Sequence, residues 1–414
     1  MSASFLQVPA TFDPYALRSE FPILTRTIND KPLVYLDNAA SSQNPVCVIE
    51  AMREAMEVSY ANVHRGLHTL ANETTERFEN SRKTVAEFLN AKSDQEIILT
   101  SGTTGAINLL AAGFGQGLQA GDEIILSQME HHSNIVPWHF LRESKGVVLR
   151  WVPVTDSGDL DMEAYSSLFS SKTRLVALTH MSNVLGTIND AKAIVKLAHE
   201  RGVPVLLDGS QAAVHLPVDV QELDVDFYAI TGHKLYGPTG IGALYGKFER
   251  LKQLPPWQGG GEMVQSVSCT EISYVDPPHR FEAGTPPIIE AAGFGAALTW
   301  LSALDRVALA EHEDLLLREV EAGLQAFDDV TILGRSENKA ALCTFEIAGM
   351  HAHDIAQLLD KYGVAIRAGT HCAEPLMRRF NTSSTCRVSF AAYNTIEEVR
   401  VFLTSLEKVR GFLQ

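Results

Sequence analysis

The chain contains 414 residues, 45% of them hydrophobic and 20% charged, which is the composition of an ordinary globular protein and a length that favours two domains. Asp and Glu total 50 against 34 for Lys and Arg, giving a net charge of -16. An acidic surface repels phosphate backbones, which argues against nucleic acid as a partner. No apolar run reaches about 18 residues, so we expect no membrane span.

The N-terminus and the cysteines indicate the compartment. Residues 1–24 have no apolar core followed by a small-residue cleavage site, so we expect no signal peptide. Five cysteines without a CxxC pair argue against a disulfide framework and a cysteine-rich zinc site, and we expect no metal. We therefore expect a cytoplasmic protein, or an organellar one if a targeting segment has been removed. Cys47, in a helical pattern, and Cys343, in a strand-like run, are expected to be buried.

Apolar runs alternate with helix-like stretches between about residues 50 and 300. Helices are expected at residues 73–89 and 191–201. Buried strands are expected at residues 96–100, 123–126, 147–149, 175–178 and 203–207. Strands separated by helices predict an α/β fold with a doubly wound, mostly parallel sheet. Such sheets bind ligands beyond the carboxyl ends of their strands.

The last third of the chain has a different texture. A helical pattern covers residues 295–327 and is broken near Ala303 and Asp305. Shorter strands and helices follow, at residues 341–347, 354–362 and 396–409, which predicts a smaller α+β domain. We therefore divide the chain into an N-terminal arm that joins the small domain (1–30), a large domain (31–297) and a small domain (298–414).

A glycine-containing turn joins the strand expected at residues 96–100 to a helix. It reads Thr100-Ser101-Gly102-Thr103-Thr104. Free backbone N–H groups at the helix start, together with the hydroxyls of Thr103 and Thr104, are suited to a phosphate group. A turn and helix cap without any ligand explains the same residues equally well.

Two further residues together indicate a cofactor. Asp208 closes a strand, and Lys234 follows a strand-like run 26 residues later. Each alone has an ordinary explanation, as a turn-capping acid and a solvated lysine. Together they supply the acid and the amine that a pyridoxal 5'-phosphate (PLP) site requires. Thr231 and His233, beside the lysine, are placed for phosphate contacts.

Eight motifs extend this pattern over residues 31–400, and they occur in the order Tyr35–Ala40, Asn62–Gly66, Gly102–Thr104, Glu130–Asn134, Asp208–Gln211, Gly232–Gly237, Arg280–Pro286 and Arg367–Ala373. In these motifs the chain resembles cysteine desulfurases of the SufS/CsdA group, within the aminotransferase class V superfamily. The resemblance implies the fold type I of PLP-dependent transferases.

The resemblance also implies roles for individual residues. His131 would stack on the cofactor ring and assist proton transfer, and Gln211 would hydrogen-bond its phenolic oxygen. Asn183 would contact the substrate. Thr285 would reach the phosphate of the neighbouring subunit, which implies a homodimer with shared sites.

Cys372 and Arg387 separate this reading from a transaminase. A thiolate is a strong nucleophile, although composition alone would make Cys372 a buried apolar thiol as readily. Arg387 would grip the substrate carboxylate through two parallel hydrogen bonds, with Arg367 as a second candidate. The resemblance then implies that L-cysteine becomes L-alanine, and that a persulfide on Cys372 passes to a SufE-type or SufU-type acceptor for iron–sulfur cluster assembly.

Other functions remain open at the level of sequence. A selenocysteine lyase, acting on L-selenocysteine, would share the fold, cofactor and substrate grip. Another class V enzyme, such as an aminotransferase or epimerase, would have no use for Cys372. A catalytically silent scaffold in a sulfur-transfer complex is the third alternative. The chain departs from the family pattern at Gly105, often Glu, and at Thr370, often His. Neither position supplies a required chemical group. Because Thr370 lies two residues from Cys372, its change leaves open the reactivity of the thiol and the acceptor preference of the loop.

Overall fold

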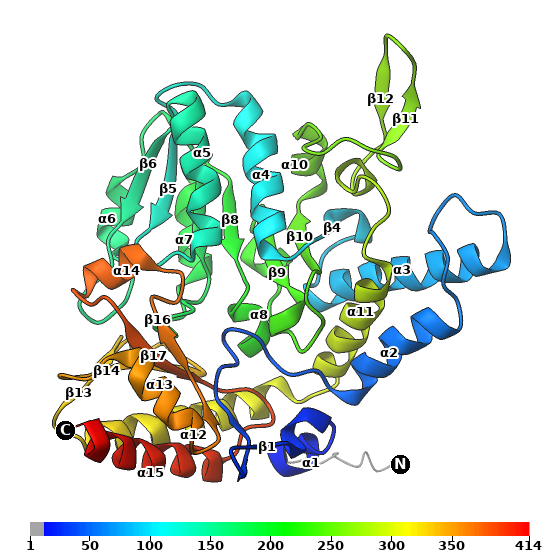
Figure 1. The fold of residues 1–414 in the computed structure, drawn as a ribbon. Helices are drawn as coiled ribbons and strands as arrows, with labels where there is room; N and C mark the ends of the chain where they lie inside the picture. Colours follow the sequence, from blue (N-terminus) through cyan, green and yellow to red (C-terminus); the bar gives the residue numbers. More distant parts are fainter. Residues whose placement is uncertain (1–11, 414) are drawn as a thin grey trace, which may run out of the picture.

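The computed structural model describes residues 12–413, and its centre is a seven-stranded sheet (Figure 1). In spatial order the strands are β4 (Ile97–Thr100), β10 (Gly242–Gly246), β9 (Phe227–Thr231), β8 (Val205–Asp208), β7 (Thr173–Thr179), β5 (Glu123–Ser127) and β6 (Val148–Val152). The pairs from β9 to β6 are parallel, whereas β10 runs antiparallel to both β4 and β9. The predicted doubly wound sheet is confirmed; β10, with its reversed direction, was not predicted.

Both faces of this sheet are buried. Successive side chains of a strand point to opposite faces, so alternate residues of a buried strand pack into different apolar clusters. In β7, Leu175 and Ala177 join an apolar cluster with residues of α4 and α5. Val176 and Leu178 join a second cluster with residues of α3, α7 and α11. Unbroken apolar runs are therefore what a sheet covered on both faces requires.

Helices of varied length surround the sheet. They are α2 (Val46–Glu57), α3 (Thr69–Phe88), α4 (Thr103–Gly117), α5 (Val136–Lys145), α6 (Met162–Ser167), α7 (Ala191–His199), α8 (Ala212–His215), α9 (Val220–Leu223), α10 (Phe248–Gln253) and α11 (Ile288–Ser302). The predicted helices at residues 73–89 and 191–201 correspond to α3 and α7.

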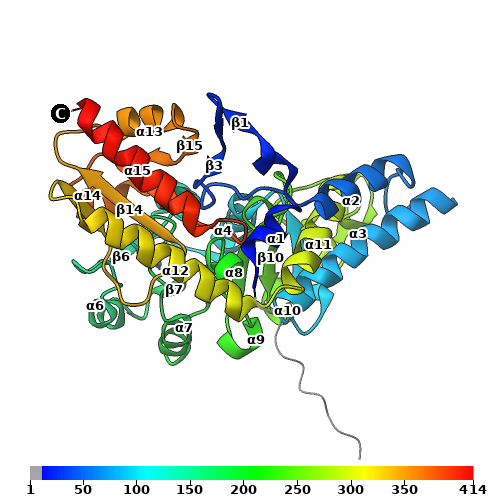
Figure 2. The same cartoon turned by 90° about the horizontal axis from the view of Figure 1, so that it is seen from below.

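The C-terminal part forms a separate four-stranded antiparallel sheet, ordered β13 (Val330–Leu333), β14 (Leu342–Ile347), β17 (Thr385–Ser389) and β16 (Arg367–Gly369). Its helices are α12 (Arg306–Gln325), α13 (Ala352–Asp360), α14 (Glu374–Arg379) and α15 (Ile396–Leu413). Figure 2 shows α12 and α15 side by side, and these two helices contact each other. Strands mixed with helices match the predicted α+β texture.

The N-terminal segment packs onto this smaller part. Strand β3 (Val34–Tyr35) pairs in parallel with β15 (Val364–Ala365), and Arg18, which ends α1 (Pro14–Arg18), forms an ion pair with Glu398 at 2.8 Å. Residues 1–11 of the predicted arm lie outside the described residues. The predicted boundary after residue 297 falls inside α11, and the predicted break near residues 303–305 lies between α11 and α12. The domain limits stay a prediction.

One hairpin extends away from the body of the molecule (Figure 1). It consists of β11 (Val264–Val267) and β12 (Ile272–Tyr274). Within residues 12–413 no single helix has the length and apolar character needed to cross a membrane, and α11 and α12, which pass that test only as a pair, meet at an angle of 85°.

The cysteine predictions had mixed outcomes. Cys343 is buried in β14, as predicted, and Cys386 is buried in the neighbouring strand β17. Cys47 lies in a helix as predicted, but the prediction of its burial is wrong, because its residue is exposed. The buried face of α2 is formed by Val48 and Ala55, and a step of one residue turns a helical side chain by roughly 100°.

Candidate active site

A pocket of about 430 Å³ opens where several strands of the large sheet end. Thr179, Asp208 and Thr231 end β7, β8 and β9, and all three line it. The C-terminal part contributes Arg367, His371, Cys372 and Arg387. Apart from Thr285, every site residue predicted from the sequence lines this pocket: Thr103, Thr104, His131, Asn183, Asp208, Gln211, Thr231, His233, Lys234, Arg367, Cys372 and Arg387.

One side of the pocket is the N-terminus of α4. Gly102 precedes this helix with φ +102°, a backbone conformation that residues other than glycine rarely adopt. The hydroxyls of Thr103 and Ser210 lie 2.7 Å apart, and so do the hydroxyls of Thr104 and Ser133. Free N–H groups and hydroxyls at a helix start form an anion site, so this side fits a phosphate group.

Asp208 lies at the end of β8 and is buried. The backbone N–H of Ser210 donates to its Oδ1 at 2.9 Å, and the Ser210 hydroxyl donates to the same oxygen at 2.6 Å. These contacts fix the carboxylate and leave Oδ2 for a ligand. A fixed carboxylate in a pocket is suited to a protonated ring nitrogen. Ser210 lies in the motif Asp208–Gln211, but no role was predicted for it from the sequence.

Lys234 ends the short 3-10 helix η4 (Gly232–Lys234), which follows β9. Burial in the pocket lowers the pKa of its ammonium group to about 8, although the charge of Asp208 opposes the shift. At pH 7, one unit below this pKa, about a tenth of the side chain is therefore the neutral amine, far more than for an exposed lysine. A neutral amine is the form that attacks carbonyl groups and accepts protons.

His131 and Gln211 complete the walls around these groups. Burial, reinforced by the charge of Lys234, lowers the pKa of His131 to about 4, so its ring is neutral near pH 7. The N–H of Ser133 donates to Nδ1 of His131 at 3.1 Å, which places the ring proton on Nε2. Gln211 donates from Nε2 to the carbonyl of Ala39 at 2.8 Å, and this bond fixes the orientation of its amide.

Arg387 is a buried cation facing the pocket. One Nη donates to the carbonyl of Asn183 at 2.7 Å, and the other lies 3.3 Å from Oδ1 of Asp37. Its Nε is buried and has no partner within residues 12–413. A buried donor without a partner is costly, and a substrate carboxylate would satisfy it.

Asp37 was not predicted as a site residue, although it stands in the quoted motif Tyr35–Ala40. Its Oδ2 lies 3.8 Å from a guanidinium nitrogen of Arg367, so one carboxylate serves both Arg367 and Arg387. Burial raises the pKa of Asp37. Arg367 is 53% exposed at its side chain, which makes it the weaker candidate for substrate binding.

Cys372 lies in the loop between β16 and α14, and its residue is exposed as well as lining the pocket. Its neighbour His371 is buried, and burial lowers the pKa of His371 to about 3. A thiol that borders both a ligand pocket and solvent can react with a bound molecule and then with a second protein.

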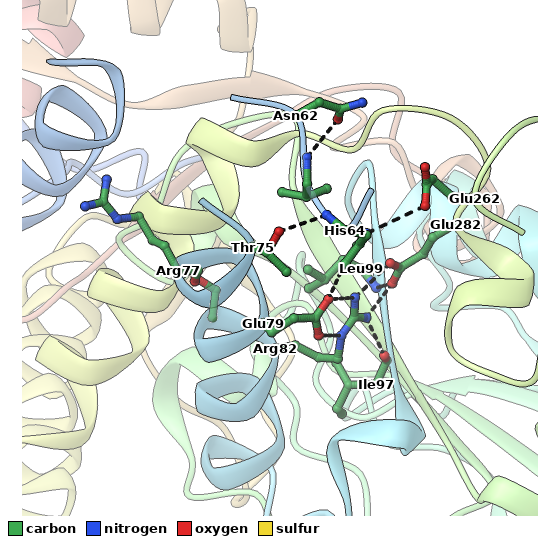
Figure 3. A network of polar contacts seen from close by, with 12 residues as sticks. Asn62, His64, Thr75, Arg77, Glu79, Arg82, Ile97, Leu99, Glu262 and Glu282 are labelled. Carbon is green, nitrogen blue, oxygen red and sulfur yellow. Dashed lines mark hydrogen bonds and ion pairs between the residues drawn. The ribbon is translucent and has the colours of Figure 1, made fainter. Parts of the chain in front are cut away.

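Thr285 does not line the pocket of its own chain. Its motif, Arg280–Pro286, lies against the motif Asn62–Gly66 through a partly buried polar network (Figure 3). Arg82, 1% exposed, pairs with Glu282 at 2.5 Å and with Glu79 at 2.8 Å. His64 is 2.7 Å from Glu79. The network thus fixes both motifs away from the pocket.

The same network contains a group with metal-ligand chemistry. The ligand atoms of His64, Glu79 and His279 lie within 4.8 Å of one another. However, Arg82 and His64 already donate to both carboxylate oxygens of Glu79. The charges are balanced by side chains of the chain itself, so the group is explained as an ion-pair network.

Comparison with known proteins defines the class. The family model for aminotransferase class-V proteins matches residues 34–402, and the chain belongs to this family. Its fold is the fold type I of PLP-dependent enzymes.

Particular relatives narrow the comparison to one activity. The chain is 47% identical over 405 residues to a cysteine desulfurase of Shigella flexneri, covering 97% of this chain and 100% of the relative. The crystal structure of the cysteine desulfurase CsdA from Escherichia coli has a TM-score of 0.91 at 39% identity, covering 98% of this chain and 100% of the other. An apo cysteine desulfurase structure from Thermococcus onnurineus NA1 also has a TM-score of 0.91, at 35% identity, covering 99% and 100%.

Proposed function

We infer that the protein is a PLP-dependent cysteine desulfurase that releases L-alanine from L-cysteine. The observation that carries this inference is the shared pocket of Cys372, Arg387, Lys234 and Asp208. The relatives, all named for this activity, favour it over a selenocysteine lyase or another class V reaction.

The pocket fits the cofactor. Lys234 would hold PLP covalently, Asp208 would face its ring nitrogen, and the start of α4 would hold its phosphate. His131 and Gln211 would border the ring. When bound, PLP supplies an electron sink for the Cα of an amino acid.

The side chains then divide the work. Arg387 binds the substrate carboxylate, and its unpartnered Nε supplies one of the two donors. The neutral amine of Lys234 removes the Cα proton and later returns a proton to the product.

Sulfur transfer is the work of Cys372. Its thiolate attacks the substrate sulfur, so that an S–S bond forms and the C–S bond of the substrate breaks. The electron pair of the broken bond stays with the carbon fragment, which is protonated and leaves as alanine. The sulfur stays on Cys372 as a persulfide.

An exposed cysteine suits onward transfer of this sulfur. We propose that the persulfide passes to the cysteine of a small acceptor protein of the SufE or SufU type, for iron–sulfur cluster assembly. A persulfide relay requires reduced thiols, which supports the proposal of a cytoplasmic location.

We also propose that the enzyme is a homodimer. Thr285 lies outside the pocket of its own chain, which supports its predicted contact with the neighbouring site. Exposed apolar side chains gather on α2, α3 and the loop between them, and Leu67 is 99% exposed. The others are Val46, Ile49, Met56, Val58, Tyr60 and Leu70. A second copy covering them would remove apolar surface from water.

The test of the sulfur step is mass spectrometry after incubation with L-cysteine. We expect one added sulfur atom on Cys372 in the wild type and none anywhere in Cys372→Ser, which should still bind PLP. Cys269→Ser is the matched control, because Cys269 is also exposed but lies in the projecting hairpin. Added sulfur on another cysteine, or normal alanine release by Cys372→Ser, would show the assignment to be wrong.

A further inference from the structure

The loop that carries Cys372 has an unusual backbone. Gly369 has φ +128°, and the non-glycine residues His371 and Cys372 have φ +53° and +56°. The left-handed region is unfavourable for a residue with a Cβ atom. Two such residues in succession persist only where surrounding contacts enforce them.

Those contacts come from segments around the large sheet. Asn183, which follows β7, donates from Nδ2 to the carbonyl of His371 at 2.9 Å. The backbone N–H of His132 donates to the carbonyl of Cys372 at 2.8 Å. The carbonyl groups of both left-handed residues are therefore held.

His132 also contacts the loop beyond the cysteine. The backbone N–H of Glu374 donates to Nε2 of the His132 ring at 3.3 Å. His132 thus contacts the loop on both sides of Ala373, at the carbonyl of Cys372 and at the N–H of Glu374. On the opposite side, Nε2 of the buried His371 ring lies 2.8 Å from the hydroxyl of Thr385 in β17.

We propose that His132 and Asn183 are positioning residues, a clamp that holds Cys372 in its left-handed conformation with the thiol at the pocket. The proposal rests on the proposed function, because only a nucleophile requires its thiol to be held at the pocket. It changes the interpretation of both residues. Asn183 was expected only to contact the substrate, and His132 stood in the motif Glu130–Asn134 without a predicted role at the site.

The clamp links the thiol to the substrate-binding groups. The carbonyl of Asn183 accepts a hydrogen bond from Arg387 at 2.7 Å, while its side chain holds the cysteine loop. His132 directly follows His131, which lines the same pocket. Cys372 and Arg387 are therefore both held by Asn183. The distance between the nucleophile and the cation that binds the carboxylate is thus set before the substrate binds.

Hydrogen–deuterium exchange tests the clamp without reference to activity. In the PLP-loaded enzyme, His132→Ala removes the acceptor for the Glu374 N–H, and exchange in a peptide covering residues 370–376 should accelerate roughly 5-fold. His132→Gln should restore protection, because a glutamine side-chain oxygen accepts at about the position of Nε2. His139→Ala is the control: His139 lies on α5, near Trp151, and has no hydrogen bond to the loop.

Kinetics and a second variant complete the test. His132→Ala should lower kcat for alanine release roughly 5-fold or more with KM for cysteine nearly unchanged, because Arg387 still binds the carboxylate. Asn183→Asp, which lacks the donor, should accelerate exchange in the same peptide even without substrate. A residue that only contacted substrate would leave that exchange unchanged.

The outcomes separate the clamp from the function. Wild-type exchange in both variants, or a glutamine variant as impaired as the alanine one, would overturn the clamp while Cys372 could still collect sulfur. Absence of sulfur on Cys372 in the wild type would overturn the proposed function, whatever the exchange rates.

Discussion

The side chain of Lys234 connects burial to chemistry. Its ammonium is desolvated in the pocket, which lowers its pKa to about 8 from the ordinary 10.5. Below pH 8 the proton blocks the nitrogen, and above pH 8 the free amine predominates. We expect the rate of PLP incorporation into the cofactor-free protein to rise roughly tenfold per pH unit below pH 8 and to level off above it. The change in absorbance on incorporation measures this rate.

The charge of Asp208 provides the control. Because this charge raises the pKa of Lys234, Asp208→Asn should move the midpoint of incorporation to lower pH. Lys234→Ala should leave no cofactor covalently attached after borohydride reduction. An incorporation rate that keeps rising through pH 9.5 in the wild type would contradict the lowered pKa.

Arg387 tests how the substrate is held. Arg387→Lys keeps the positive charge but loses the planar pair of donors, so we expect KM for cysteine to rise, with a cost of roughly 1.5–3 kcal/mol. kcat should change less, since the carboxylate is bound in both ground and transition states. Steady-state alanine release measures both constants. The matched variant Arg367→Lys should change KM less, because Arg367 is the more exposed cation. A larger rise of KM in Arg367→Lys than in Arg387→Lys would show that Arg367 binds the substrate carboxylate.

At the scale of one element, the start of α4 combines a glycine turn with free N–H groups. In Gly102→Ala, a Cβ would lie 3.2 Å from the Thr231 hydroxyl, and φ +102° would be strained. We expect a loss of roughly 1–3 kcal/mol in the free energy of unfolding, together with weaker PLP binding. Chemical denaturation and cofactor titration measure the two effects.

The same helix supplies the control. Gly117 ends α4, and a Cβ there would meet no atom within 4 Å. Gly117→Ala should therefore leave cofactor affinity unchanged. Equal loss of affinity in both variants would mean that the turn at Gly102 has no particular part in holding phosphate.

At the scale of the whole molecule, the separation of Thr285 from its own pocket suggests shared sites. We expect Lys234→Ala and Thr285→Ala homodimers each to be impaired, the first completely. Subunits exchanged between them should form hybrids in which one intact Lys234 is served by an intact Thr285 from its neighbour. Activity of the mixture should then exceed the sum of the separate variants.

Light scattering supplies the accompanying measurement of mass. A monomeric mass at working concentration, or no gain of activity after verified subunit exchange, would contradict the proposal of a shared site. A gain would place Thr285 in the neighbour's pocket, since no other arrangement restores a complete site.

The sequence by itself determined the large sheet and the cofactor pair. Runs such as Leu175–Leu178 are apolar on both sides of the strand, and this pattern requires helices on both faces. Asp208 ends β8 and Lys234 follows β9, and these two strands pair in parallel. Their meeting at one edge therefore follows from local pattern and connectivity. The motif Arg367–Ala373 carried Cys372, and the family resemblance carried Arg387.

Only the tertiary structure decided the contacts between distant segments. Asp37 meets Arg387 across 350 residues, and Asn183 meets the cysteine loop across 188. Cys47 is exposed because of the face that α2 presents, which a helical pattern alone leaves open. Periodicity reports on neighbours along one element. The pairing of side chains from separate sheets depends on how those sheets pack, and that packing is set by the summed burial of the whole chain.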